Sequence, residues 1–155
     1  MKKIILLALL FSFAINIHVS AQSKETRKAQ FQSTYNSTKS LVNSQVYNFI
    51  GDVVFDGSTR EKLNSDSNTI VINKSNITGK LTALQSKKNA LDVNGAIENY
   101  TVTSNDDKQQ VLVQFKVVTA AQTLDANIQV KPNGNAVLRV SSNNGDIITW
   151  VGFIK

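Results

Sequence analysis

The side chains that most often perform catalysis at neutral pH are almost absent from this sequence. It contains no cysteine, and its only histidine, His18, lies in an apolar leader. Catalytic sites that pair histidine with serine or cysteine, and zinc sites of the usual His and Cys type, therefore have no residues to build them. The glycines are isolated, so we expect no phosphate-binding loop. The only reactive groups left for a catalytic or binding site are carboxylates, lysine amines, hydroxyl groups and tyrosines.

Carboxylates can act as an acid and a base near neutral pH only if two of them converge in a cleft that raises one pKa. Most of the 11 acidic residues fall in expected turns, loops or solvent-facing strand positions. Asp52 and Glu98 differ because both lie inside expected strands. Asp52 is opposite the face of its strand that Tyr47, Phe49, Val53 and Phe55 are expected to share. Glu98 is expected to share a face with Tyr100. They are the candidate carboxylates of an enzyme, but we expect no catalytic residues.

Two other acidic patterns resemble sites without meeting their requirements. Asp106-Asp107 is expected at a hairpin tip, where neighbouring side chains diverge. Residues 64–68 begin like a calcium loop, with the pattern Asn-x-Asp-x-Asn, but Thr69 replaces the required glycine and Ser75 the bidentate glutamate. We therefore expect neither a metal nor another cofactor.

Aromatic side chains on expected strands are the other candidates for a site. Trp150 and Tyr100 are the leading pocket positions, although aromatic residues on strands belong more often to the core. Four further aromatic residues could join them: Tyr47, Phe49, Phe55 and Phe115. If a pocket exists, its mouth should lie near the loops at 57–68 and 85–95.

Residues 1–21 have the pattern of a Sec-type signal peptide. Lys2-Lys3 precedes an apolar run over residues 4–15, and Val19-Ser20-Ala21 is a small-residue cleavage site. A transmembrane anchor is the alternative, but the run is short for a span and polar residues interrupt its end. We expect a protein exported to the periplasm or beyond the cell, with no stable membrane anchor after cleavage.

The remaining chain, residues 22–155, suits one domain. The whole sequence carries 17 Lys and Arg against 11 Asp and Glu, a formal net charge of +6. Its basic residues are scattered, whereas nucleic-acid-binding proteins usually concentrate them on one face. We therefore expect no nucleic-acid partner.

The last third of the chain predicts an antiparallel meander. Apolar and polar residues alternate along it, which is typical of strands with one buried face. Asn144-Gly145 and residues 131–134 have the composition of tight turns. The last strand is apolar on both faces, which predicts that it is sandwiched between layers. The expected strands here are 110–118, 123–131, 135–142 and 146–154.

The earlier part predicts a helix over residues 22–43, with Ala29, Phe31 and Tyr35 on its apolar stripe, and then the start of the sheet over 45–155. Its expected strands are 46–55, 69–73, 77–84 and 96–103, with loops at 59–68 and 85–94. Gly51 indicates a bulge in the first strand. The fold class is all-β with one N-terminal helix, an antiparallel meander of about eight strands that forms a curled sheet, sandwich or open barrel.

The C-terminal residues resemble the bacterial domain of unknown function 4251 family. The segments that carry the resemblance are Gly134–Ser142 and Ile148–Ile154, which fit the family's G-x-A-x-L-x-V and aromatic-x-G-x-I patterns. The aromatic residue is Trp150, where tyrosine is commoner. The resemblance covers about residues 41–154, but residues 81–85 depart from an L-P-Y-F-G-like segment of the family. It implies a secreted protein of this fold and brings no activity.

We expect a non-catalytic envelope protein that binds a ligand or another protein, of unknown identity. A structural or stress-related envelope component is the first alternative, and a carboxylate-dependent hydrolase is the second. A closed apolar cavity would favour a ligand, whereas a flat apolar patch or an exposed edge strand would favour the structural component. Two carboxyl groups that face each other across a cleft would favour the hydrolase.

Overall fold

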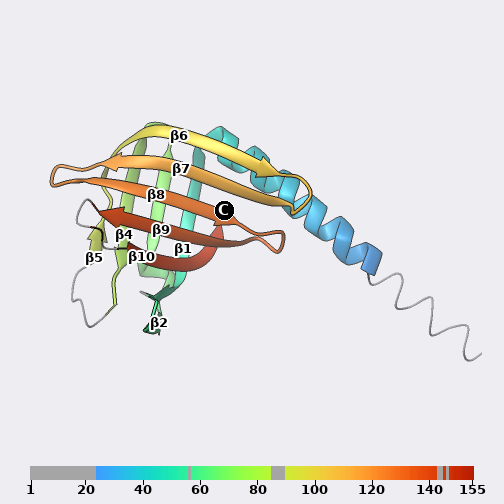
Figure 1. The fold of residues 1–155 in the computed structure, drawn as a ribbon, viewed down its shortest axis with the longest axis horizontal. Coiled ribbons are helices and arrows are strands. Elements are labelled where there is room, and N and C mark those ends of the chain that lie inside the picture. Colours follow the sequence, from blue (N-terminus) through green and yellow to red (C-terminus); the bar gives the residue numbers. More distant parts are fainter. Residues whose placement is uncertain (1–23, 56, 85–89, 143–144, 146) are drawn as a thin grey trace, which may run out of the picture.

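The computed structural model describes residues 24–55, 57–84, 90–142, 145 and 147–155. An N-terminal helix, residues 24–44, leads into an antiparallel β-sheet (Figure 1). The predicted signal peptide lies outside the described residues. The strands are β1 (Val46–Phe55), β2 (Arg60–Lys62), β3 (Thr69–Asn73), β4 (Asn76–Thr82), β5 (Ala90–Asp92), β6 (Gly95–Asn105), β7 (Gln110–Val118), β8 (Thr123–Val130), β9 (Asn135–Ser142) and β10 (Ile147–Ile154).

The sheet closes on itself as a barrel. Its order is β10-β9-β8-β7-β6-β4-β3-β1-β2, and β10 also pairs with β1. Two short strands lie outside the closed ring: β2 pairs with the end of β1, and β5 pairs with β4. The predicted all-β fold with one N-terminal helix is confirmed, and the pairing of β10 with β1 makes the barrel closed rather than open.

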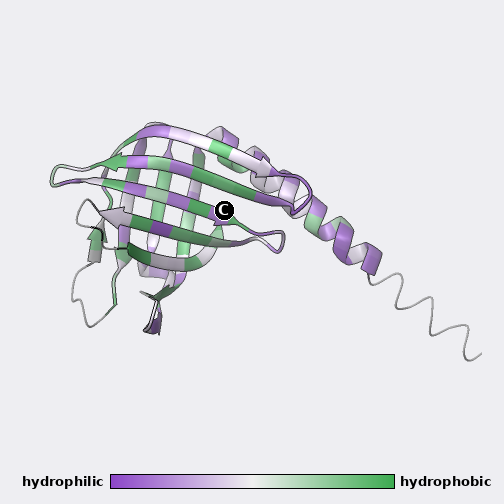
Figure 2. Ribbon diagram, in the orientation of Figure 1, coloured by the Kyte–Doolittle hydropathy of each residue, from purple (hydrophilic) through white to green (hydrophobic). Residues whose placement is uncertain are grey.

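Strands β7 to β10 follow the predicted meander. β7 and β9 have the predicted bounds, and hydrophobic and hydrophilic residues alternate along β7 to β9 (Figure 2). The prediction that β10 is sandwiched between layers is wrong, since Ile147 is 57% exposed and Phe153 37%. In a closed barrel only the inner face of a strand meets other side chains across the core, and the outer face meets solvent.

A β-bulge interrupts β1 beside Gly51, as predicted. The register with β10 shifts between Gly51 and Val53. The extra residue reverses which side chains face the core, because strand side chains alternate with period two. Val54 is therefore buried, whereas Val53 and Phe55 are half-buried. The expected single face that joins Phe49 to Phe55 is wrong for this reason.

Two strands lie where the sequence predicts loops. β2 falls within residues 59–68, together with a 3-10 helix at Ser65–Ser67, and β5 falls within residues 85–94. Both strands have only three residues, too few to show a periodic pattern. β4 ends at Thr82, earlier than predicted.

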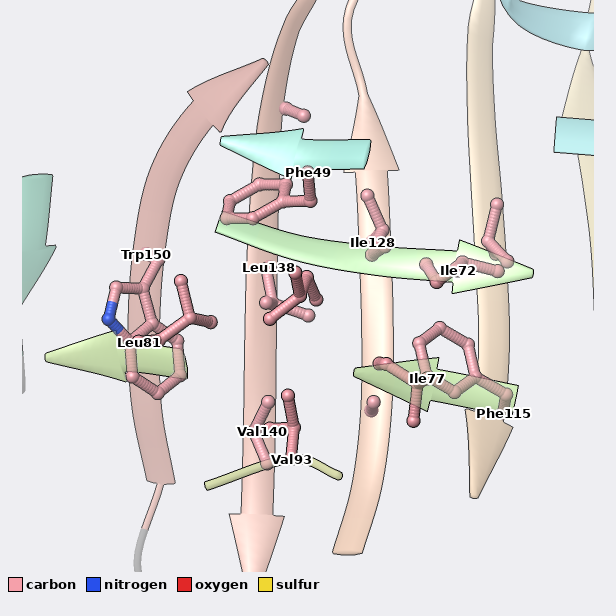
Figure 3. Packing of buried hydrophobic residues seen from close by; sticks show 14 of the residues in the cluster. Phe49, Ile72, Ile77, Leu81, Val93, Phe115, Ile128, Leu138, Val140 and Trp150 are labelled. Carbon is pink, nitrogen blue, oxygen red and sulfur yellow. The ribbon is translucent and has the colours of Figure 1, made fainter. Parts of the chain in front are cut away.

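Side chains from two crossing sets of strands fill the barrel. Figure 3 shows Phe49, Ile72 and Leu81 from β1, β3 and β4 in front of the strands β7 to β10, which carry Phe115, Ile128, Leu138 and Trp150. These residues belong to one hydrophobic cluster. The largest fully buried side chains are Trp150, Phe49, Ile70, Ile72, Ile77, Leu81, Leu84, Leu124, Ile128, Leu138, Val42 and Val54.

The C-terminal half of the helix packs on the barrel, and the N-terminal part extends beyond it (Figure 1). Tyr35, Thr38 and Val42 are buried, whereas residues 24–33 are all exposed. The predicted apolar stripe is therefore wrong for Ala29 and Phe31, which have no barrel surface beneath them. No helix among the described residues is long and apolar enough to cross a membrane.

The hairpin between β6 and β7 holds the side of this helix. The Asp106 carboxylate accepts hydrogen bonds from the Tyr35 hydroxyl and, at 3.1 Å, from the Lys39 ammonium. These two donors lower the pKa of Asp106, first through the Tyr35 hydrogen bond and then through that of Lys39. The side-chain amide of Gln109 also donates to Gln32, at 2.7 Å.

Candidate functional site

Trp150 belongs to the barrel core. Its side chain is fully buried, and its indole N–H donates a hydrogen bond to the Thr82 carbonyl oxygen at 2.9 Å. This bond satisfies the one polar atom of the side chain. Trp150 also lies opposite Leu138 in the register of β9 and β10. The structure therefore gives Trp150 a packing role and does not place it on an accessible pocket wall.

Tyr100 lies at the helix end of the barrel and is half-buried. Its ring stacks on Phe115 with 5.9 Å between centroids. Its hydroxyl donates to the Val42 carbonyl oxygen at 2.7 Å and lies 3.2 Å from the Tyr47 hydroxyl. Burial raises the pKa of both tyrosines, so both stay neutral and able to donate. Tyr100 therefore anchors the helix.

The two candidate carboxylates do not come together. Asp52 is half-buried in the β1 bulge, where it accepts a hydrogen bond from the Ser65 hydroxyl at 2.7 Å. Glu98 is exposed on β6, opposite Lys116 of β7. β3 and β4 lie between β1 and β6 in the sheet. Among the described residues, no three His, Cys, Asp or Glu side chains gather as a metal site.

The prediction that Glu98 shares a face with Tyr100 is wrong. The register of β6 with β7 shifts between Glu98 and Thr101, and Asn99 has a positive φ of 54°. This second bulge places Tyr100 toward the core and leaves Glu98 on the outer surface. Asn99 is the only residue whose type indicates this bulge in the sequence, because asparagine adopts a positive φ more readily than most residues.

The structure contains a pocket on the outside of the barrel, at the turn between β1 and β2. It has a volume of ≈ 290 Å³. It lies beside the first of the two predicted mouth loops, 57–68, but of the predicted aromatic residues only Phe55 lines it. Residues 85–89 of the second predicted loop lie outside the described residues. The lining residues are Phe55, Gly57, Ser58, Thr59, Arg60 and Val151.

This pocket lies in a larger apolar surface that we call the outer patch. Across the strands, Val137 of β9 lies beside Val151 of β10, and Val151 beside Val53 of β1. Phe55 and Phe153 extend this row along β1 and β10. All five side chains are on the outer face of the barrel and are half-buried or exposed. The outer patch consists of Val53, Phe55, Val137, Val151 and Phe153.

Basic side chains flank the outer patch on two sides. Arg139 of β9 lies beside Thr149, Thr149 beside Phe55, and Phe55 beside Arg60 of β2. Lys62 follows on β2, opposite Val53. All three cations are exposed. The salt bridges found among the described residues are Lys39–Asp106 and Lys116–Asp125, so none of the three flanking cations has a carboxylate partner there.

A family model described as a domain of unknown function (DUF4251) matches residues 29–154. The chain belongs to the DUF4251 family. The match begins within the helix, earlier than the resemblance read from the C-terminal residues. A crystal structure of a DUF4251 family protein from Bacteroides eggerthii DSM 20697 has the same fold, with a TM-score of 0.66 and 12% identity over 79% of this chain and 87% of that chain. No curated protein matches the sequence significantly.

Proposed function

We propose that this DUF4251 protein is an exported, non-catalytic binding module that recognises another protein through the outer patch. The observation that carries the proposal is the pocket between Phe55 and Val151, whose wall includes Arg60, a cation with no carboxylate partner in the described part of the chain. Contiguous apolar surface with a polar rim is typical of protein interaction sites.

The filled core supports recognition on the outside of the barrel. Eight-stranded barrels have an interior that either is filled by side chains or holds one small ligand. Here large side chains from both sets of strands meet in the middle (Figure 3). Trp150, the leading candidate for an interior pocket, is part of this packing.

The separation of the carboxylates supports a non-catalytic role. Acid and base chemistry by two carboxyl groups requires them to lie on either side of one bound substrate. Asp52 and Glu98 are on strands that are not neighbours, and Glu98 is exposed on the outer surface. Export is supported by the apolar leader with its small-residue cleavage site.

Site-specific photo-crosslinking in cells that make the protein tests the proposal. A benzophenone amino acid at Phe153 would lie on the outer patch, and the same probe at Gln114 of β7 is a matched control on the outer face of a distant strand. We expect a discrete protein adduct from position 153 and none from position 114. Equal adducts from both positions, or none from position 153, would contradict the proposal.

A structural component of the envelope is the second candidate, and the exposed apolar surface favours it as well. The two roles differ in stoichiometry. A structural component would be crosslinked almost completely to one abundant partner under all growth conditions, whereas a recognition module would show partial occupancy that depends on the supply of its partner.

A further inference from the structure

We infer that the outer patch binds an extended segment of a partner protein that carries two acidic residues four positions apart, with a large apolar residue midway between them. This inference rests on the proposed function and specifies the partner of the same surface. It follows from the spacing of Arg60 and Arg139 and from the pocket residues on the strands between them.

The distance between the arginines follows from the strand order. Arg139 is on β9 and Arg60 on β2, with β10 and β1 between them. Neighbouring strands are about 4.8 Å apart, so three steps separate the two backbone positions by about 14 Å. An extended chain advances about 3.3 Å per residue, so four residues cover about 13 Å. Acidic side chains at positions i and i+4 of one face therefore match the two arginines.

The pocket lies between the two cations. Phe55 and Val151 line it, and Arg60 forms part of its wall. In an extended segment the side chain at i+2 points the same way as those at i and i+4. A phenylalanine or leucine at that position would enter the ≈ 290 Å³ pocket while its acidic neighbours reach the arginines.

The charges of the surface favour acidic rather than basic partners. Arginine binds carboxylates through two parallel hydrogen bonds, and both arginines are exposed without a carboxylate partner among the described residues. Lys62 adds a third positive charge beside Arg60. Glu61, the acid of β2, lies opposite the buried Val54 and thus on the other face.

One arginine in the pocket wall and a second one three strand spacings away distinguish a peptide from a simple amphiphile. A fatty acid has one anionic group at the end of its chain and would engage one arginine. A peptide with an acidic residue on each side of an apolar residue would engage both arginines. We therefore favour a protein segment, and binding of a fatty acid becomes an outcome of the test.

The test is a titration of the mature protein, residues 22–155, followed by NMR of its backbone amides. The probe is the peptide Ac-SESFSES-NH2. Three control peptides replace both acids by glutamine (SQSFSQS), replace the aromatic residue by serine (SESSSES), or place the acids two positions apart (SSEFESS). Sodium dodecanoate is titrated separately.

We expect the probe to shift amide signals at Phe55, Arg60, Val151 and Arg139, and each control peptide to bind more weakly. Arg60→Gln and Arg139→Gln should each weaken binding by about two- to fivefold, the effect of one exposed ion pair. Lys131→Gln, an exposed lysine in the turn after β8, should leave binding unchanged.

Equal binding of the glutamine peptide, equal binding of the peptide with acids two positions apart, or shifts confined to other surfaces would overturn the inference. Binding of dodecanoate but not of the peptide would also overturn it. In each case an adduct from position 153 in cells would keep the proposed function, because that experiment does not depend on the acidic pattern. If the peptide does not bind as expected and position 153 gives no adduct, both the inference and the proposed function are overturned.

Discussion

The hydroxyl of Tyr100 donates a hydrogen bond to the carbonyl oxygen of Val42 across 2.7 Å. Val42 lies in the last turn of the helix, and its carbonyl oxygen also accepts a hydrogen bond from the Gln45 backbone N–H at 3.2 Å. Ser44 caps a neighbouring carbonyl, that of Leu41, at 2.6 Å. Tyr100 therefore joins the end of the helix to the wall of the barrel through a carbonyl group of the last helical turn.

Tyr100→Phe should lower the free energy of unfolding by about 0.5–1.5 kcal/mol, the net contribution of one hydrogen bond, because the Val42 carbonyl oxygen keeps the Gln45 N–H as a donor. Tyr47→Phe is the comparison, since the contact of its hydroxyl is the 3.2 Å one with Tyr100. Tyr47→Phe should lower the free energy of unfolding by less than Tyr100→Phe does. Chemical denaturation of both variants checks this order, and a Tyr100→Phe protein as stable as wild type would show that the helix is held by other contacts.

Gly152→Ala should destabilise the barrel at its closing seam by at least about 1–3 kcal/mol, the cost of overpacking. Gly152 lies opposite Gly51 in the pairing of β10 with β1, and a Cβ atom there would collide with the carbonyl oxygen of Ile50. At Gly51 the added Cβ would only touch the Leu81 side chain, at 3.5 Å. Gly51→Ala is therefore the matched control, with a small expected effect on the denaturation midpoint.

Ile128→Ala should cost about 2–5 kcal/mol, as for a buried aliphatic side chain. Ile128 is fully buried in the barrel, whereas Asn127 points to the outer face. Asn127→Ala should cost no more than about 0.5 kcal/mol. Urea denaturation of the two variants measures the difference, and equal losses would mean that the two faces of β8 are assigned incorrectly.

Asp106→Asn should lower stability at neutral pH, and the difference from wild type should disappear in acid. The folded protein lowers the pKa of Asp106 below its ordinary value of 3.8. A lowered carboxyl pKa contributes stability that is present above the ordinary value and is lost as the pH falls through the folded value. Thermal unfolding between neutral pH and strongly acidic pH measures the change. Asp107→Asn is the control, and a difference that persists at the acidic end would contradict the assignment.

The repeating part of the fold could be predicted because alternation with period two reports one buried face. This signal located β7 to β10, and Gly51 marked the first bulge. The consequence of that bulge was missed, since one inserted residue exchanges the faces of Val53 and Val54. The bulge of β6 carries no glycine, so the face of Glu98 was also assigned wrongly.

The outer patch could not be predicted because its residues meet only when the barrel closes. Val53 and Phe55 are on β1, whereas Val151 and Phe153 are on β10 at the other end of the chain. The sequence shows the apolar outer residues of β10, but a strand that is apolar on both faces predicts a second layer rather than an exposed patch. Arg60 fell in a segment too short and too polar to be recognised as a strand.

The pairing of β1 with β10 also sets when the protein can finish folding. The ring closes only when its first strand, β1, pairs with its last strand, β10. Such a contact joins residues far apart in the chain, so it forms late and slowly. Until β10 is in place, β1 and β9 each keep an open edge that could pair with another chain. Docking of β10 removes both edges in one step.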